Sequence, residues 1–74
     1  MMNGEQVKVD YASSTVTYVG LAVCGAGVDD SKWSIKKIVT DANGKLLSIQ
    51  RSNGVLDQNC KWSDRADTTK IEYK

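Results

Sequence analysis

The chain has 74 residues, a net charge of +1 and no histidine. This length allows one domain, residues 1–74, with a core so thin that self-association is favoured. Ten Lys and Arg are interspersed with nine Asp and Glu. This distribution excludes the clustered cations on which nucleic-acid binding depends.

The first predicted element is a half-buried strand over residues 5–11. Apolar and polar residues alternate there, which places Val7, Val9 and Tyr11 on one face of the strand. The segment Ala12-Ser13-Ser14 that follows is typical of a turn.

Residues 15–24 form the longest run of β-forming residues, with Gly20 marking a bulge or a bend. From Tyr18 onward this strand is apolar on both faces. One face is expected to pack on the domain core. The other needs cover from a second sheet or from a neighbouring subunit.

Residues 32–40 fit either a strand or a short helix, and their β-branched side chains favour the strand. A bulge at Lys36-Lys37 is expected in this strand. It would let three apolar residues share one face: Trp33, Ile35 and Ile38.

Two Asn-Gly pairs, Asn43-Gly44 and Asn53-Gly54, predict turns with positive φ angles on either side of a strand over residues 45–52. Residues 68–74 alternate again and predict a final strand. The chain is therefore predicted to be all-β, a small antiparallel barrel or sandwich of about five strands.

The polar segment 57–66 is too irregular for a strand, and one helical turn is expected around Trp62. We expect Trp62 to plug the open end of the sheet core. Arg65 would pair with Asp57 or Asp64 and donate hydrogen bonds to carbonyl groups of the loop. The alternative is a binding hot spot, because Trp and Arg are enriched at interfaces.

The two cysteines, Cys24 and Cys60, could form a disulfide within or between chains, or could remain free thiols. They are too far apart in sequence for a redox CxxC motif. Two thiols without a histidine cannot build an ordinary structural zinc site within one chain.

No pattern indicates catalysis, a cofactor or a metal. The loop Gly25-Ala26-Gly27 matches no nucleotide-binding motif, and Asp29-Asp30 supplies too few oxygens for calcium. A hydrolase that uses Asp57 and Asp64 is disfavoured because so small a domain has no obvious cleft. The sequence therefore predicts no enzyme, no small-molecule substrate, no metal and no cofactor.

The N-terminus shows no secretory signal, and no apolar run is long enough to span a bilayer. We therefore expect a protein that is made in the cytoplasm and has no membrane partner.

Short motifs in this chain resemble a family of small bacteriophage proteins found among virion structural genes. The family pattern is a Tyr-x-Gly-x-Ala segment, a Trp-x-Ile-x-x-Ile strand, an Asn-Gly hairpin and a phenylalanine-rich acidic segment that ends in Trp-Asp-x-Arg-Ala. This chain has Trp-x-Asp-Arg-Ala at that end and no phenylalanine. The matching residues are Tyr18, Gly20, Ala22, Trp33, Ile35, Ile38, Asn43, Gly44, Ser48, Ile49, Asp57, Asn59, Trp62, Asp64, Arg65, Ala66 and Tyr73.

This resemblance implies a structural component of a tailed-phage virion, as a capsid decoration or cement subunit or as a neck or tail accessory. Its partners would be other virion proteins and further copies of itself. The alternative is a free intracellular protein-binding module, such as a phage-encoded inhibitor of a host protein. The candidate interface or structural residues are Tyr18, Leu21, Val23, Trp33, Trp62, Arg65 and Tyr73.

Overall fold

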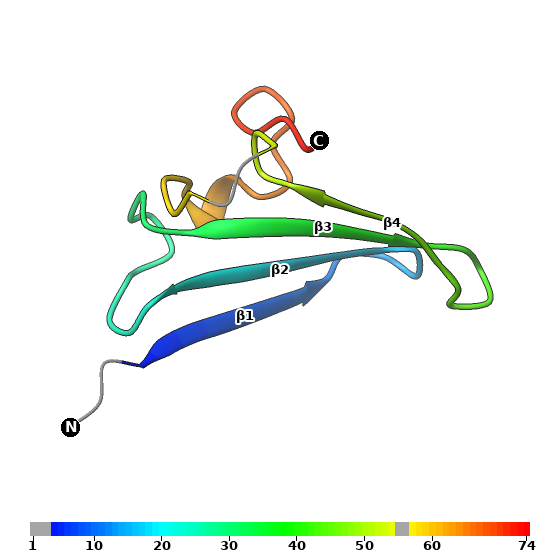
Figure 1. Cartoon of the computed structure of the whole chain (residues 1–74), viewed down its shortest axis with the longest axis horizontal. Helices are drawn as coiled ribbons and strands as arrows, with labels where there is room; N and C mark the ends of the chain where they lie inside the picture. The colour runs from blue at the N-terminus through cyan, green and yellow to red at the C-terminus, as the bar shows by residue number, and fades with distance from the viewer. Residues whose placement is uncertain (1–3, 55–56) are drawn as a thin grey trace.

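The computed structural model describes residues 4–54 and 57–74; the single-domain prediction extends over residues 1–3 and 55–56, which lie outside this part. The described residues form one four-stranded sheet in the order β1-β2-β3-β4, and each pair of neighbours is antiparallel (Figure 1). The strands are β1 Glu5–Tyr11, β2 Val16–Val23, β3 Ser34–Thr40 and β4 Leu46–Arg51. The all-β class is confirmed.

The turns between the strands are closed by short polar side chains. Ser13 Oγ accepts hydrogen bonds from the backbone N–H groups of Thr15 and Val16, at 3.2 and 3.1 Å. Asp41 Oδ1 accepts from the N–H groups of Asn43 and Lys45, both at 2.9 Å. These bonds replace the ladder bonds that the chain loses where it reverses direction.

The two Asn-Gly turns differ in backbone conformation. At the second turn Asn53 and Gly54 have φ angles of 54° and 73°, as the sequence predicts. At the first turn, among the described residues, only Gly44 has a positive φ angle, which is 84°. The Asp41 carboxylate already holds that turn, so Asn43 does not need the left-handed conformation.

The expected bulge at Lys36-Lys37 is wrong. Strand β3 pairs residue by residue with β2 over this stretch and with β4 on its other edge, which leaves no room for an extra residue. Ile35 and Ile38 therefore point to opposite faces of the sheet. The register shift lies further along, between Val39 and Thr40.

The expected strand over residues 68–74 is also wrong, and in this segment the structure has a single bridge between Ser52 and Tyr73. Asp67 causes the change. Its carboxylate accepts from the N–H and hydroxyl of Thr69, and its carbonyl accepts from the N–H groups of Lys70 and Ile71. Those N–H groups are unavailable to a sheet, and the Thr69 hydrogen bonds lower the pKa of Asp67.

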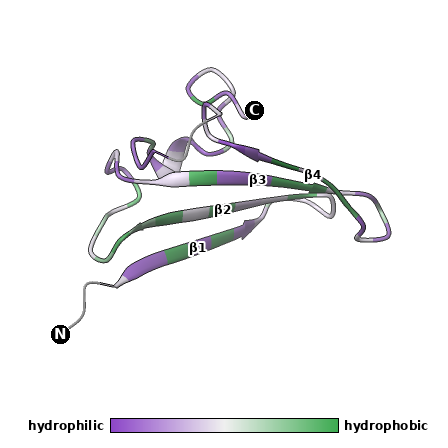
Figure 2. Ribbon diagram, viewed as in Figure 1, coloured by the Kyte–Doolittle hydropathy of each residue, from purple (hydrophilic) through white to green (hydrophobic). Residues whose placement is uncertain are grey.

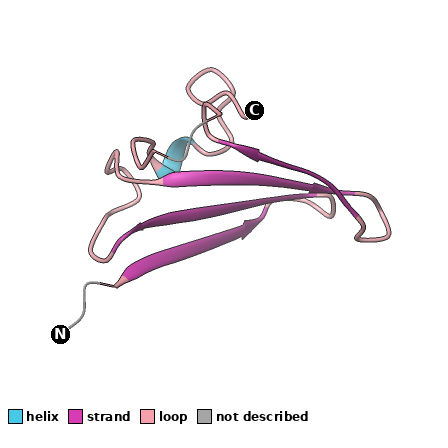
Figure 3. Ribbon diagram, in the orientation of Figure 1, coloured by secondary structure: helices cyan, strands magenta, loops and turns pink. Residues whose placement is uncertain are grey.

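The C-terminal segment, residues 57–74, forms the second layer of the domain by covering one face of the sheet (Figures 1 and 3). It contains a short 3₁₀ helix, Trp62–Asp64, where the sequence predicts one helical turn. The core lies between the two layers. Its buried apolar residues are Tyr18, Ala22, Ala26, Trp33, Ile35, Cys60, Trp62 and Ile71.

Gly20 is a point where the two layers approach each other closely. A Cβ atom at this position would lie 2.5 Å from Cε3 and Cζ3 of Trp62 and 2.9 Å from Cε3 of Trp33. Strand β2 pairs continuously through Gly20, so the predicted bulge or bend is absent there. Gly20 instead provides a flat patch of backbone on which the Trp62 ring packs.

The sheet remains open. Strands β1 and β4 are its two edges within the described chain, so these residues form neither a closed barrel nor a sandwich of two sheets. The molecule measures 41 × 29 × 18 Å along its principal axes. Its layers are one sheet and one irregular covering segment.

Candidate interaction surface

Trp62 is held in place by Arg65. The guanidinium carbon of Arg65 lies 4.8 Å from the centre of the Trp62 ring, and Nη1 donates to the Trp62 carbonyl at 3.2 Å. The predicted hydrogen bond to a loop carbonyl is therefore confirmed. A cation stacked on an indole ring strengthens the packing at this point.

The predicted ion-pair partner of Arg65 is wrong. Arg65 Nε lies 2.8 Å from Oδ2 of Asp10, a residue of β1, whereas Asp64 pairs with Lys70 at 3.5 Å. Asp10 pairs with Tyr18 in the sheet and shares the covered face with it. The ion pair therefore joins the covering segment to the first strand.

Tyr73, near the C-terminal end of the covering segment, contacts both Arg65 and Tyr18. Its hydroxyl donates to the Arg65 carbonyl at 2.7 Å, and its ring centre lies 5.6 Å from that of Tyr18. Burial raises the pKa of the Tyr73 phenol, since the charged phenolate would lose its hydration. Tyr73 therefore belongs to the packed layer.

Both tryptophans serve the core. Trp33 is fully buried and its Nε1 donates to the Gly27 carbonyl at 2.9 Å, while Trp62 is 6% exposed. Their ring centres are 5.6 Å apart. This placement favours the structural interpretation of Trp62 over the binding hot spot, because little of the ring is available to a partner.

The two thiols are not joined in the structure. Cys60 is buried, where its sulfur accepts from Nδ2 of Asn53 at 3.7 Å, and Cys24 is exposed. A disulfide within one chain is therefore absent here. A bond between chains through Cys24 remains a prediction.

The opposite face of the sheet, which we call the open face, has no covering segment among the described residues and is largely apolar. Strand pairing places on this face side chains from all four strands. Its apolar members are Val7, Val9, Tyr11, Val19, Leu21, Val23, Ile38, Leu46 and Ile49. Hydrophobic and hydrophilic residues alternate along β1 in Figure 2, as expected for a strand whose two faces differ.

These apolar side chains are unusually exposed. Val7 is 59% exposed, Ile49 53% and Tyr11 80%. Of the interface candidates from the sequence, Leu21 and Val23 lie here, while Tyr18, Trp33 and Trp62 lie in the core. The sequence pattern grouped Val7, Val9 and Tyr11 on one face, but it did not reveal that the C-terminal segment covers the other.

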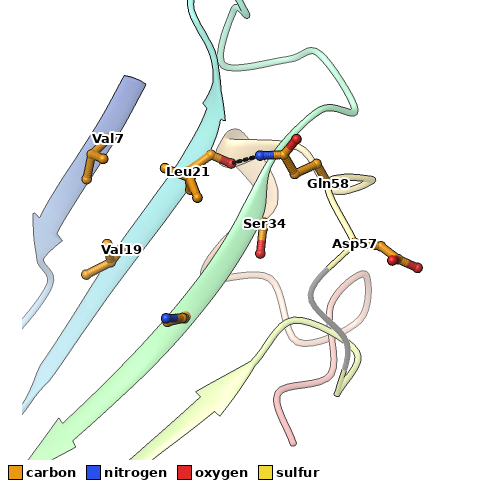
Figure 4. Close-up of a pocket in the computed structure, with 7 residues that line it drawn as sticks. Val7, Val19, Leu21, Ser34, Asp57 and Gln58 are labelled. Carbon is orange, nitrogen blue, oxygen red and sulfur yellow. Dashed lines mark hydrogen bonds between the residues drawn. The ribbon is translucent and has the colours of Figure 1, made fainter. Parts of the chain in front are cut away.

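A hollow of about 610 Å³ lies on the open face (Figure 4). Its floor is formed by side chains of β1, β2 and β3, and Asp57 and Gln58 form one wall. Gln58 Nε2 donates to the Leu21 carbonyl at 3.4 Å and to Glu5 Oε2 at 3.5 Å. These bonds attach the start of the covering segment to the margin of the open face.

One pair of like charges interrupts the apolar surface. Lys36 and Arg51 are direct cross-strand partners on β3 and β4, and both are exposed. Neither forms an ion pair within the part of the chain described. Like charges that face each other across a ladder are destabilising unless an anion neutralises them.

Across residues 4–54 and 57–74, no group of three or more His, Cys, Asp or Glu side chains is arranged to hold a metal ion. Asp57 lines the hollow, whereas Asp64 is not among the residues that line it and pairs with Lys70 at 3.5 Å. In this same part of the chain, no helix is long and apolar enough to cross a membrane.

Comparison with protein-family models, with curated proteins and with solved structures gave no match for this chain. The resemblance to small phage virion proteins therefore stays a prediction. Among the described residues, the surface is a broad apolar sheet face that no segment covers, and its basic pair, Lys36 and Arg51, has no anionic partner.

Proposed function

We propose that this protein is a structural component of a tailed-phage virion and acts by protein–protein contacts through the open face. It would serve as a capsid decoration or cement subunit, or as a neck or tail accessory. The uncovered apolar face is the observation that carries the proposal. The sequence resemblance supplies the virion setting.

The size of the open face supports a role in contact. Four strands spaced ~4.8 Å apart and about seven residues long, at ~3.4 Å per residue, give an outline of about 450 Å². The largest apolar patch on a typical monomer is ~300–600 Å² and is often functional. The open face, on which Lys36 and Arg51 interrupt the apolar side chains, is of this size although the total accessible surface of the domain is 4822 Å².

The difference in structure between the covered face and the open face of the sheet also supports the proposal. The covered face holds the buried core and the Arg65–Asp10 ion pair, so the open-face side chains are free to serve a different contact. A rigid sheet presents those side chains in a fixed arrangement, which lowers the entropy cost of binding. No catalytic step is required of such a protein.

Quantitative mass spectrometry of purified phage particles tests the proposal. A copy number near that of the major capsid protein would indicate decoration or cement, and a small fixed ratio would indicate the neck or tail. Absence from the particles would overturn the virion role and favour the alternative, a free intracellular inhibitor of a host protein.

A matched pair of variants tests whether the open face makes the contact. Val9 on the open face and Val28 in a loop are 49% and 43% exposed. Val9→Lys is expected to remove the protein from particles, and Val28→Lys to leave it there. Equal incorporation of the two variants would show that another surface makes the contact.

A further inference from the structure

Two neighbouring rows of side chains cross the centre of the open face, and their chemistry is complementary. The acidic row consists of Val7, Leu21, Ser34 and Asp57, in order from β1 to the wall of the hollow (Figure 4). The basic row consists of Val9, Val19, Lys36 and Arg51, in order from β1 to β4. In each row the two residues on β1 and β2 are apolar, and the other two residues are polar or charged.

We propose that a second copy of this chain packs its open face on the first, about a two-fold axis that crosses the strands between these rows. Such an axis lays the acidic row of one copy on the basic row of the other. Val7 and Leu21 then meet apolar side chains of β1 and β2. Asp57 and Ser34 meet Arg51 and Lys36. This inference rests on the proposed function, since it names the occupant of the same face.

The area of the open face suits such a dimer. Two faces of about 450 Å² each contribute ~900 Å² of flat outline, and specific interfaces bury ~1,200–2,000 Å² of accessible surface in total. Because projecting side chains add accessible area to a flat outline, the surface that such a dimer buries is larger than its outline and closer to the area of specific interfaces. The contact also has the usual anatomy of an apolar centre with charged groups toward its margin.

Charge argues for a second copy in particular. The Lys36–Arg51 pair lacks an anion within the described residues, and Asp57, on the same face, has no cation partner there. A two-fold axis places Asp57 of each copy beside the Lys36–Arg51 pair of the other copy, so the same charge contact forms twice. The aliphatic stems of Lys36 and Arg51 can cover apolar surface while their charges meet the carboxylate.

The dimer also supplies the layer that the isolated sheet lacks. Two open faces packed together form a sandwich of two four-stranded sheets, with the aligned packing that such sheets adopt. The apolar residues on both faces of β2 are then buried, one set by the C-terminal segment and the other by the second copy. A domain this short commonly gains stability by such self-association.

Sedimentation equilibrium of the full chain tests the proposal. At concentrations of tens of micromolar we expect a mass of twice 8.1 kDa. Val9→Lys should sediment as a monomer, and Val28→Lys as a dimer. Far-UV circular dichroism separates loss of association from loss of the fold, and Ile49→Lys on β4 provides a second open-face variant if Val9→Lys does not fold.

Three outcomes would overturn the dimer. They are an unmodified chain that stays at 8.1 kDa, open-ended association in place of a closed dimer, and equal effects of the Val9 and Val28 changes. An unmodified chain that is monomeric in solution yet present in particles would sink the dimer and leave the virion role intact. A chain that dimerises in solution but is absent from particles would overturn the virion role and leave the dimer intact.

Charge reversal tests the proposed axis. Asp57→Arg and Arg51→Asp should each weaken dimerisation by at least about tenfold, because each juxtaposes like charges. The double variant restores an opposite pair, so its dissociation constant should return to within about threefold of the original. A double variant weaker than either single change would show that these residues do not face each other, which overturns this axis.

Discussion

Gly20→Ala is the sharpest test of how the two layers of the domain fit together. The added Cβ would lie 2.5 Å from two carbon atoms of the Trp62 ring and 2.9 Å from one of the Trp33 ring. Overpacking of this kind costs ~1–3 kcal/mol, whereas removing a strand glycine returns ~0.5–1 kcal/mol of chain entropy. The difference is about 0–2.5 kcal/mol, and because the contacts of 2.5 Å are with a rigid ring, we expect a net loss in its upper part, about 1–2 kcal/mol.

This loss is large for such a chain. At ~0.05–0.15 kcal/mol per residue, a domain of this length has a free energy of unfolding of about 4–11 kcal/mol. With a urea m-value near ~1 kcal/mol per molar, the midpoint of unfolding should fall by about 1–2 M. Tryptophan fluorescence reports the core rings directly, and far-UV circular dichroism reports the sheet.

Two further variants isolate the cause. Gly27→Ala is the matched control, because its added Cβ would meet nothing closer than Asp30 Oδ2 at 3.5 Å; it should change stability by no more than ~0.5 kcal/mol. In a Trp62→Leu background, Gly20→Ala should cost at least ~0.5 kcal/mol less. A Gly20→Ala protein as stable as the original, or an equal cost in both backgrounds, would refute the close contact.

Two other predictions concern titration and thiol reactivity. Burial raises the pKa of Tyr73, so its phenol stabilises the fold fully below the ordinary tyrosine pKa of ~10, and that contribution is lost by up to ~1.4 kcal/mol per pH unit above it. Urea titrations from about pH 9 to 11 should therefore show a shallower alkaline loss for Tyr73→Phe than for the exposed control Tyr11→Phe; equal slopes would contradict the assignment. In native protein a maleimide should label Cys24 at once and Cys60 only as the chain unfolds, which mass spectrometry of timed samples detects. Rapid labelling of both thiols would contradict the buried position of Cys60.

The sequence was most informative where one local rule acts alone. Alternation over residues 5–11 predicted β1 with its observed bounds, and the polar segment around Trp62 predicted a helical turn. It failed where a local hydrogen-bonded turn overrides the alternation of apolar and polar residues. The final strand was lost because Asp67 captures the N–H groups of Thr69, Lys70 and Ile71. No periodicity of apolar residues reveals that capture.

The candidate site shows the same limit. The sequence pattern correctly indicated that β2 is apolar on both faces and that one of them packs on the core. The choice of covered face depends on Gly20, where the missing side chain admits Trp62, and on the link between Arg65 and Asp10 across the molecule. These contacts join residues more than forty positions apart, which sequence periodicity cannot resolve.

The covering layer is made last, because residues 57–74 follow all four strands in the chain. During synthesis the sheet can emerge with both apolar faces exposed, and the core closes only when Trp62, Arg65 and Tyr73 arrive. Closure of the core is therefore expected to wait for residues 57–74, and a chain cut short before residue 57 should remain prone to aggregation. Under the virion proposal, only a subunit that carries this covering segment would be fit for assembly.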